Sequence, residues 1–227
     1  MISDINTVKM TDSVSEDNNN LCYKKELLFK YLVIGDYGVG KTSIIRRYAE
    51  DTFSSKYKIT IGADFAIKTI TWDNYTTINL QLWDIAGHER FGALTSVYYR
   101  YALAAALVFD LTRPETLNSI PKWLKDLRNR SSLPNGQNLP VILLANKGDV
   151  NLDNIPKHLD EFCKENNILT WFITSAKENI NLDIAMNTLI DYTLHHKYYK
   201  TPNEETQPLI LNETEKPKNG RKRFCFF

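Results

Sequence analysis

The chain has 227 residues, 43% of them hydrophobic, and its 28 basic and 27 acidic residues give a formal net charge of +1. The length fits one domain with tails, and the near-neutral charge predicts no general attraction to nucleic acid or to a membrane surface. Three widely spaced cysteines form no metal-ligand pattern, so we expect neither disulfides nor zinc, as in a reducing cytosol. No apolar run follows Met1, so we expect no signal peptide.

The composition changes twice along the chain. Residues 1–26 are rich in Asn, Asp, Ser and Thr and predict a disordered N-terminal extension. Residues 27–198 carry the apolar runs of a folded domain. Residues 199–227 turn polar and predict a flexible tail, with a basic cluster ahead of Phe224-Cys225-Phe226-Phe227.

Strand and helix patterns alternate through the folded part. Strands are predicted, in chain order, over Phe29–Ile34, Ile61–Trp72, Thr77–Trp83, Ala104–Phe109, Val141–Ala145 and Trp171–Thr174. Helices are predicted over Ile44–Ala49, Thr116–Arg130, Pro156–Glu165 and Leu182–His195, and Trp123 belongs to the apolar face of the second. This order predicts an α/β fold, with a mostly parallel six-stranded sheet and helices on both faces. Ligands of such sheets bind at the carboxyl ends of the strands.

A glycine-rich turn follows the first strand, and Gly35-Asp36-Tyr37-Gly38-Val39-Gly40-Lys41-Thr42 matches the pattern G-x-x-x-x-G-K-[ST]. The glycines allow backbone N–H groups to surround phosphate oxygens. Lys41 brings a positive charge to the terminal phosphates, and Thr42 offers a hydroxyl to Mg²⁺. The motif predicts a nucleoside triphosphate site and leaves the base open.

Two later segments favour guanine as the base. Asn146-Lys147-Gly148-Asp149 follows a buried strand, and the Asp149 carboxylate can accept the N1–H and 2-amino groups of guanine. Adenine would leave that carboxylate unpaired. Ser175-Ala176-Lys177 follows the next strand and would add a backbone donor to the guanine oxygen. Alone, Asn-Lys-x-Asp is as compatible with a surface loop, but in this order behind a P-loop it favours GTP.

The segment from Trp83 to Phe91 reads Trp-Asp-Ile-Ala-Gly-His-Glu-Arg-Phe and begins at the end of a strand. Asp84 supplies a carboxylate for a metal, Gly87 an N–H that can approach an oxygen, and His88 a polar side chain beside the attacking water. We therefore predict a loop that senses whether the terminal phosphate is present.

In this order, from Gly35 to Lys177, the motifs resemble those of small Ras-like GTPases, and within that superfamily the chain resembles the Rabs. The Rab-like stretches are Ile61-Gly62-Ala63-Asp64-Phe65, Leu80-Gln81-Leu82-Trp83-Asp84, and Arg90-Phe91 through Tyr98-Tyr99-Arg100. Ile85, Phe91-Gly92 and Trp171-Phe172 are similar to the Rab subgroup of lysosome-related organelles. The resemblance implies a P-loop NTPase fold of the small G-domain type. It also implies a GTP-hydrolysing switch that regulates vesicle traffic and recruits effectors in its GTP state.

The resemblance also implies roles for individual residues. Thr60 would join Thr42 at Mg²⁺ and the γ-phosphate, and Asp84 would hold Mg²⁺ through water. Gly87, Lys41 and His88 would form the catalytic set. The implied GTP-binding set is Asp36, Tyr37, Gly38, Val39, Gly40, Lys41, Thr42, Ser43, Phe53, Tyr57, Thr60, Gly87, Asn146, Lys147, Asp149, Ser175, Ala176 and Lys177. In that set Phe53 would pack against guanine and Tyr57 would lie over the phosphates. Phe65, Trp83 and Tyr98 resemble an aromatic triad that effectors read, beside Ile61.

His88 departs from the pattern, because the family carries Gln there to orient the attacking water. Imidazole differs in reach and titrates near neutral pH. We hypothesise slow intrinsic hydrolysis. The alternatives are an incidental variant with ordinary cycling and a GTP-bound scaffold that exchange rather than hydrolysis recycles. A third class, an ATPase or nucleotide kinase, is disfavoured by Asn146, Lys147 and Asp149.

The tail is the second departure. Only two residues follow Cys225, so the C-a-a-X pattern fails, and the chain has one terminal cysteine where Rabs often have two. A geranylgeranyl group on Cys225 would act with the basic cluster as a two-part membrane anchor; the alternative is an unmodified thiol. The implied partners are effectors, an exchange factor, an activating protein, a dissociation inhibitor and the prenylation machinery. The implied location is the cytoplasmic face of endosomal, lysosome-related or phagosomal membranes.

Overall fold

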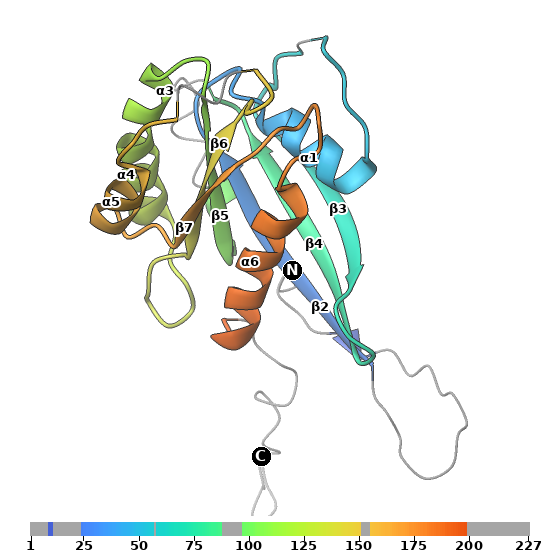
Figure 1. The fold of residues 1–227 in the computed structure, drawn as a ribbon. Coiled ribbons are helices and arrows are strands. Elements are labelled where there is room, and N and C mark those ends of the chain that lie inside the picture. The colour runs from blue at the N-terminus through green and yellow to red at the C-terminus, as the bar shows by residue number, and fades with distance from the viewer. Residues whose placement is uncertain (1–8, 11–23, 57, 88–96, 151–154, 199–227) are drawn as a thin grey trace, which may run out of the picture.

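The computed structural model describes residues 9–10, 24–56, 58–87, 97–150 and 155–198. Within these residues six strands follow one another across a sheet in the order β3-β4-β2-β5-β6-β7 (Figure 1). Neighbours along this path are parallel except the β3–β4 hairpin. The strands are β2 (Lys25–Ile34), β3 (Ala63–Thr71), β4 (Thr76–Ile85), β5 (Ala104–Asp110), β6 (Val141–Asn146) and β7 (Thr170–Ile173).

Helices cover both faces of this sheet. They are α1 (Lys41–Glu50), α3 (Glu115–Asn118), α4 (Ile120–Arg130), α5 (Leu159–Glu165) and α6 (Leu182–His195). Helices α1 and α6 contact each other over one face, and α3, α4 and α5 lie over the other (Figure 1). The predicted α/β class is therefore confirmed. None of the helices in the described ranges is long and apolar enough to cross a membrane.

The core lies on both sides of the central strands. Every residue of β5 and β6 is buried, as expected for parallel strands covered on both faces. In β4 the alternation is also as predicted, because Ile78, Leu80 and Leu82 are fully buried. Strand β3 is the edge, and most of its side chains are exposed or half-buried.

The sheet starts earlier in the chain than the predicted domain boundary at residue 27. Strand β2 begins at Lys25, whose backbone N–H donates to the Tyr75 carbonyl at 2.6 Å. A two-residue strand β1 (Lys9–Met10) pairs antiparallel with Lys25 and Glu26, inside the predicted extension. Backbone pairing does not require apolar side chains, so composition missed both features. The rest of the division into extension, domain and tail stays a prediction.

The helix predicted over Thr116–Arg130 is two helices, because the chain breaks at Ser119 between α3 and α4. Pro121 lies in the first turn of α4 and has no N–H to donate to a preceding turn. The break leaves the apolar face of α4 in place, with Ile120, Leu124 and Leu127 buried.

Candidate active site

A cavity of about 380 Å³ lies at the carboxyl end of the parallel strands, where the P-loop, the start of α1 and the loops after β6 and β7 meet. Among the predicted nucleotide-binding residues, those that line it are Tyr37, Gly38, Gly40, Lys41, Thr42, Ser43, Phe53, Thr60, Gly87, Asn146, Lys147, Asp149, Ala176 and Lys177. Val39 and Ser175 are fully buried behind it, and the carboxylate of Asp36 points to a neighbouring helix. Tyr57 and His88 lie outside the described residues.

The P-loop is held closed around the Lys41 side chain. The Lys41 ammonium donates to the carbonyls of Gly35 (2.9 Å) and Asp36 (2.8 Å), and its side chain is buried. Burial lowers the pKa of Lys41 to about 8, although Asp84 and Asp36 oppose the shift. Helix α1 begins after Gly40 with no side-chain cap, so the N–H groups of its first turn face the cavity without intrahelical acceptors. Such a helix start favours an anion.

The predicted metal ligands converge at one point. The Thr42 and Thr60 hydroxyls lie 3.0 Å apart, and both donate to the same carboxylate oxygen of Asp84, Thr60 at 3.0 Å. The second oxygen, Oδ1, is buried without a hydrogen-bond partner within the described part of the chain. Burial raises the pKa of Asp84, against the bonds from Thr42 and Thr60 and the charge of Lys41. Hydroxyl and carboxylate oxygens with an unused buried acceptor fit a hard cation such as Mg²⁺.

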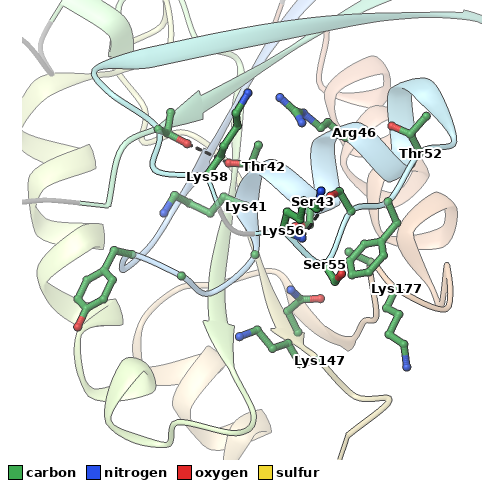
Figure 2. Close-up of a pocket in the computed structure, with 18 of the residues that line it drawn as sticks. Lys41, Thr42, Ser43, Arg46, Thr52, Ser55, Lys56, Lys58, Lys147 and Lys177 are labelled. Atoms are coloured by element: carbon green, nitrogen blue, oxygen red, sulfur yellow. Dashed lines mark hydrogen bonds between the residues drawn. The ribbon is translucent and has the colours of Figure 1, made fainter.

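The predicted base-reading residues lie around the other end of the cavity, where Figure 2 shows Lys147 and Lys177. The Asn146 amide donates to the Val39 carbonyl at 2.8 Å and so ties this loop to the P-loop. Asp149 accepts the Ser175 hydroxyl at 2.6 Å, and the Lys177 ammonium lies 3.7 Å from its other oxygen. These contacts hold the Asp149 carboxylate in a fixed orientation at the cavity wall.

Gly87 brings the predicted phosphate sensor against the P-loop. A Cβ at this position would lie 2.3 Å from the Tyr37 nitrogen and 2.5 Å from the Asp36 carbonyl carbon, closer than real Cβ contacts. Only a glycine therefore fits between the two loops as they stand.

Sequence reasoning missed several cations of the cavity wall. Arg46, Lys56 and Lys58 line it in addition to Lys41, Lys147 and Lys177, so the cavity wall is rich in positive charge (Figure 2). Arg46 had a usable signal, because it lies four residues after Thr42 on the same face of α1. Lys56 and Lys58 follow Phe53 in a loop without a spacing rule, so nothing in the sequence marked them.

The aromatic triad is assembled at the β3–β4 edge of the sheet. The rings of Phe65 and Trp83 stack with centroids 5.4 Å apart, and Tyr98 lies 6.1 Å from Trp83. The Lys30 ammonium lies 3.8 Å from the Trp83 ring centroid and donates to the Arg100 carbonyl at 2.9 Å. Burial lowers the pKa of Lys30 to about 8. The structure thus brings the three predicted residues together, and the Lys30 ammonium packs against the Trp83 ring.

The chain combines a mostly parallel sheet with a P-loop, the cluster of Thr42, Thr60 and Asp84, and the loop of residues 146–149. These features together define a P-loop nucleotide-binding protein of the small GTPase class. Comparison with known proteins agrees, because residues 30–195 match the Ras family, and the chain belongs to that family. It is therefore a GTP-hydrolysing switch.

The chain is also similar to several Rabs. The chain is 51% identical to Ras-related protein Rab-32 of Homo sapiens over 184 residues, which is 80% of this chain and 81% of the relative. It is 48% identical to Ras-related protein Rab-32B of Dictyostelium discoideum over 200 residues, 87% and 77% of the two chains. It is 41% identical to Ras-related protein Rab-7L1 of Mus musculus over 197 residues, 86% and 97%. These relatives make it a Rab-type switch of membrane traffic, associated with endomembranes, and they agree with the predicted subgroup of lysosome-related organelles.

Proposed function

We propose that the cavity binds GTP and GDP with Mg²⁺ through the predicted residues that line it. The observation that carries the proposal is the meeting of the Thr42 and Thr60 hydroxyls at one oxygen of Asp84, whose other oxygen is buried with no hydrogen-bond partner among the described residues. Bound there, Mg²⁺ would neutralise charge on the phosphate oxygens. Lys41 and the N–H groups that begin α1 hold the phosphates, and Asp149 holds the base.

The switch follows from two contacts that depend on the terminal phosphate. Thr60, in the loop before β3, contacts the Asp84 carboxylate, and Gly87, just after β4, contacts the P-loop. A γ-phosphate gives both loops an additional partner, and its loss on hydrolysis releases them. The same nucleotide therefore controls the surface that lies between these loops.

That surface is the proposed effector site. Ile61 is 81% exposed and Phe65 49% exposed, which is unusual for large apolar side chains, and Phe65 stacks on Trp83, which in turn contacts Tyr98. Effectors would read this patch when Thr60 and Gly87 are ordered by GTP. Rab-type exchange factors, activating proteins, a dissociation inhibitor and the prenylation machinery complete the proposed set of partners.

His88 is proposed to make intrinsic hydrolysis slow. We expect His88→Gln to raise the single-turnover rate of GTP hydrolysis at least about tenfold, because an amide can donate to and accept from the attacking water at once. The measurement is phosphate release from the protein preloaded with GTP, without an activating protein.

His195→Gln is the matched control, since the same exchange is made on an exposed residue of α6. It should leave the rate unchanged. Equal rates for the native protein and His88→Gln would refute slow hydrolysis, and would favour the incidental variant. A native rate too slow to detect would favour the GTP-bound scaffold.

A lipid on Cys225 is proposed to anchor the protein with the basic cluster of the tail, both of which lie outside the described residues. Helix α6 runs away from the cavity end of the sheet, so the helix ends on the side of the domain opposite the cavity (Figure 1). We expect intact-mass spectrometry of membrane-bound protein from its native cells to show one geranylgeranyl group. An unmodified Cys225 in that fraction would refute the anchor. The proposed membranes are endosomal, lysosome-related or phagosomal, on their cytoplasmic face.

A further inference from the structure

Two side chains outside the cavity hold the outer arm of the P-loop, residues Asp36 and Tyr37. Trp123 of α4 donates its indole N–H to the Asp36 carboxylate at 2.8 Å. Arg113, in the loop between β5 and α3, donates to the Tyr37 carbonyl at 2.8 Å, and its guanidinium lies 5.5 Å from the Tyr37 ring centroid. Neither Arg113 nor Trp123 lines the cavity, so neither is placed to touch a nucleotide.

Arg113 is in turn fixed by a buried carboxylate. The Arg113 Nε donates to Asp110 Oδ2 at 3.0 Å, and the Lys147 ammonium lies 2.6 Å from the same oxygen. The other oxygen accepts the Thr112 N–H at 2.9 Å and its hydroxyl at 2.6 Å. Burial alone would raise the pKa of Asp110, but the bonds from Lys147, Thr112 and Arg113 hold it below its usual value.

Asp110 therefore joins the two halves of the site. Lys147 belongs to the base-reading loop, residues 146–149 at the end of β6, and Arg113 contacts the P-loop. Both bind Asp110 Oδ2 at the end of β5. A shift of either loop would break a charge-assisted bond and leave the buried Asp110 carboxylate with one partner fewer.

The outer arm needs this support because its own backbone is soft. It lies between Gly35 at φ 147° and Gly38 at φ 71°, two glycines in conformations that other residues rarely adopt. Glycine moves readily between backbone regions, so the arm has little intrinsic rigidity. Lys41 holds the Asp36 carbonyl from inside the loop, and the bonds from Arg113 and Trp123 hold the arm from outside.

We propose that Asp110, Arg113 and Trp123 form a P-loop brace, a set of positioning residues that keeps the outer arm closed on the β-phosphate and thereby sets the rate of GDP release. The proposal rests on the assignment of the cavity to a guanine nucleotide. It adds a control of GDP release by residues at the end of β5, before α3 and on α4. These residues are separate from those that line the cavity.

The test is GDP release from full-length Arg113→Gln. Arg113 is half-buried at the surface, so the fold should survive the change. We expect release of radiolabelled GDP about tenfold faster than from the native protein, equivalent to about 1.4 kcal/mol. The release rate of Arg113→Lys should lie between those of the native protein and Arg113→Gln. Lysine keeps the charge beside Asp110 but lacks a second nitrogen for the Tyr37 carbonyl. GMP affinity should change much less than GDP affinity, because GMP lacks the β-phosphate that the arm encloses.

Arg128→Gln is the matched control, because Arg128 also donates to a backbone carbonyl, that of Asn166, on the α5 side of α4. Trp123→Phe keeps the ring and removes only the donor to Asp36, and we expect it to accelerate release as well. Circular dichroism would show whether Arg113→Gln folds. If it does not, the release rate of Trp123→Phe tests the brace in its place.

Release from folded Arg113→Gln and Trp123→Phe no faster than from Arg128→Gln would overturn the brace. Parallel losses of GMP and GDP affinity would also overturn it, because the defect would then involve the base-reading loop as well. A native protein that binds neither nucleotide would instead remove the assignment of the cavity on which the brace rests, a result distinguishable from the other two.

Discussion

Replacing Asp149 by Asn is expected to convert the pocket from guanine to xanthine nucleotides. In the proposed role the carboxylate would accept the N1–H and the 2-amino group of guanine, whereas xanthine carries a carbonyl at that second position. An Asn amide can accept the N1–H and donate to this carbonyl, but it faces the guanine amino group with a second donor. We expect GTP affinity to fall about a thousandfold or more, and xanthosine triphosphate affinity to rise above it.

The local hydrogen bonding is compatible with the Asp149→Asn exchange. The Ser175 hydroxyl, 2.6 Å from Asp149, can donate to the amide oxygen of Asn as it does to the carboxylate, so the fold should not change. Competition of the two triphosphates against labelled GDP measures the preference. Asp183→Asn is the control, since that exposed carboxylate of α6 lies beside Lys68 and outside the cavity lining. Unchanged preference for GTP in Asp149→Asn would contradict the assigned role.

The fold could be predicted from the sequence where the signals were local. The buried runs that became β5 and β6 and the alternation in β4 are read directly from residue types, and their order predicts the parallel sheet. What was missed depended on backbone pairing or on one residue. Lys25 joins the sheet through its N–H bond to Tyr75, and Pro121 divides one predicted helix into two.

The site divides in the same way. Lys41, Thr42 and Asp149 were found because their chemistry requires fixed spacing behind a strand. Trp123 was assigned to the apolar face of its helix, and only the structure shows its indole N–H bonded to Asp36, 87 residues away in the chain. No spacing rule covers such a contact, because it depends on how α4 packs against the sheet.

Gly87→Ala is expected to uncouple hydrolysis from nucleotide binding. The backbone of Gly87 is not in the left-handed region, so alanine itself is conformationally allowed there. Its methyl group would instead lie 2.3 Å from the Tyr37 nitrogen, and the loop would have to move away from the P-loop. The Gly87 N–H would then no longer reach the position proposed for the γ-phosphate. Loss of one such donor costs about 10²- to 10³-fold in rate, and we expect single-turnover GTP hydrolysis to fall by that amount.

GDP binding should remain close to native in Gly87→Ala, because the P-loop, Lys41 and Asp149 still hold a nucleotide that lacks the γ-phosphate. Labelled GDP release and phosphate release, measured on one preparation, separate the two effects. Gly136→Ala adds a methyl group with no other atom within 4 Å, in the loop before β6. At φ 80° it strains only the backbone of that loop, which lies outside the cavity lining, so neither rate should change. If Gly87→Ala hydrolyses GTP at the native rate, the loop does not close on the γ-phosphate through this glycine. If it also releases GDP much faster, the contact with Tyr37 and Asp36 serves chiefly to shape the P-loop, and Gly87 would act on binding rather than on the switch.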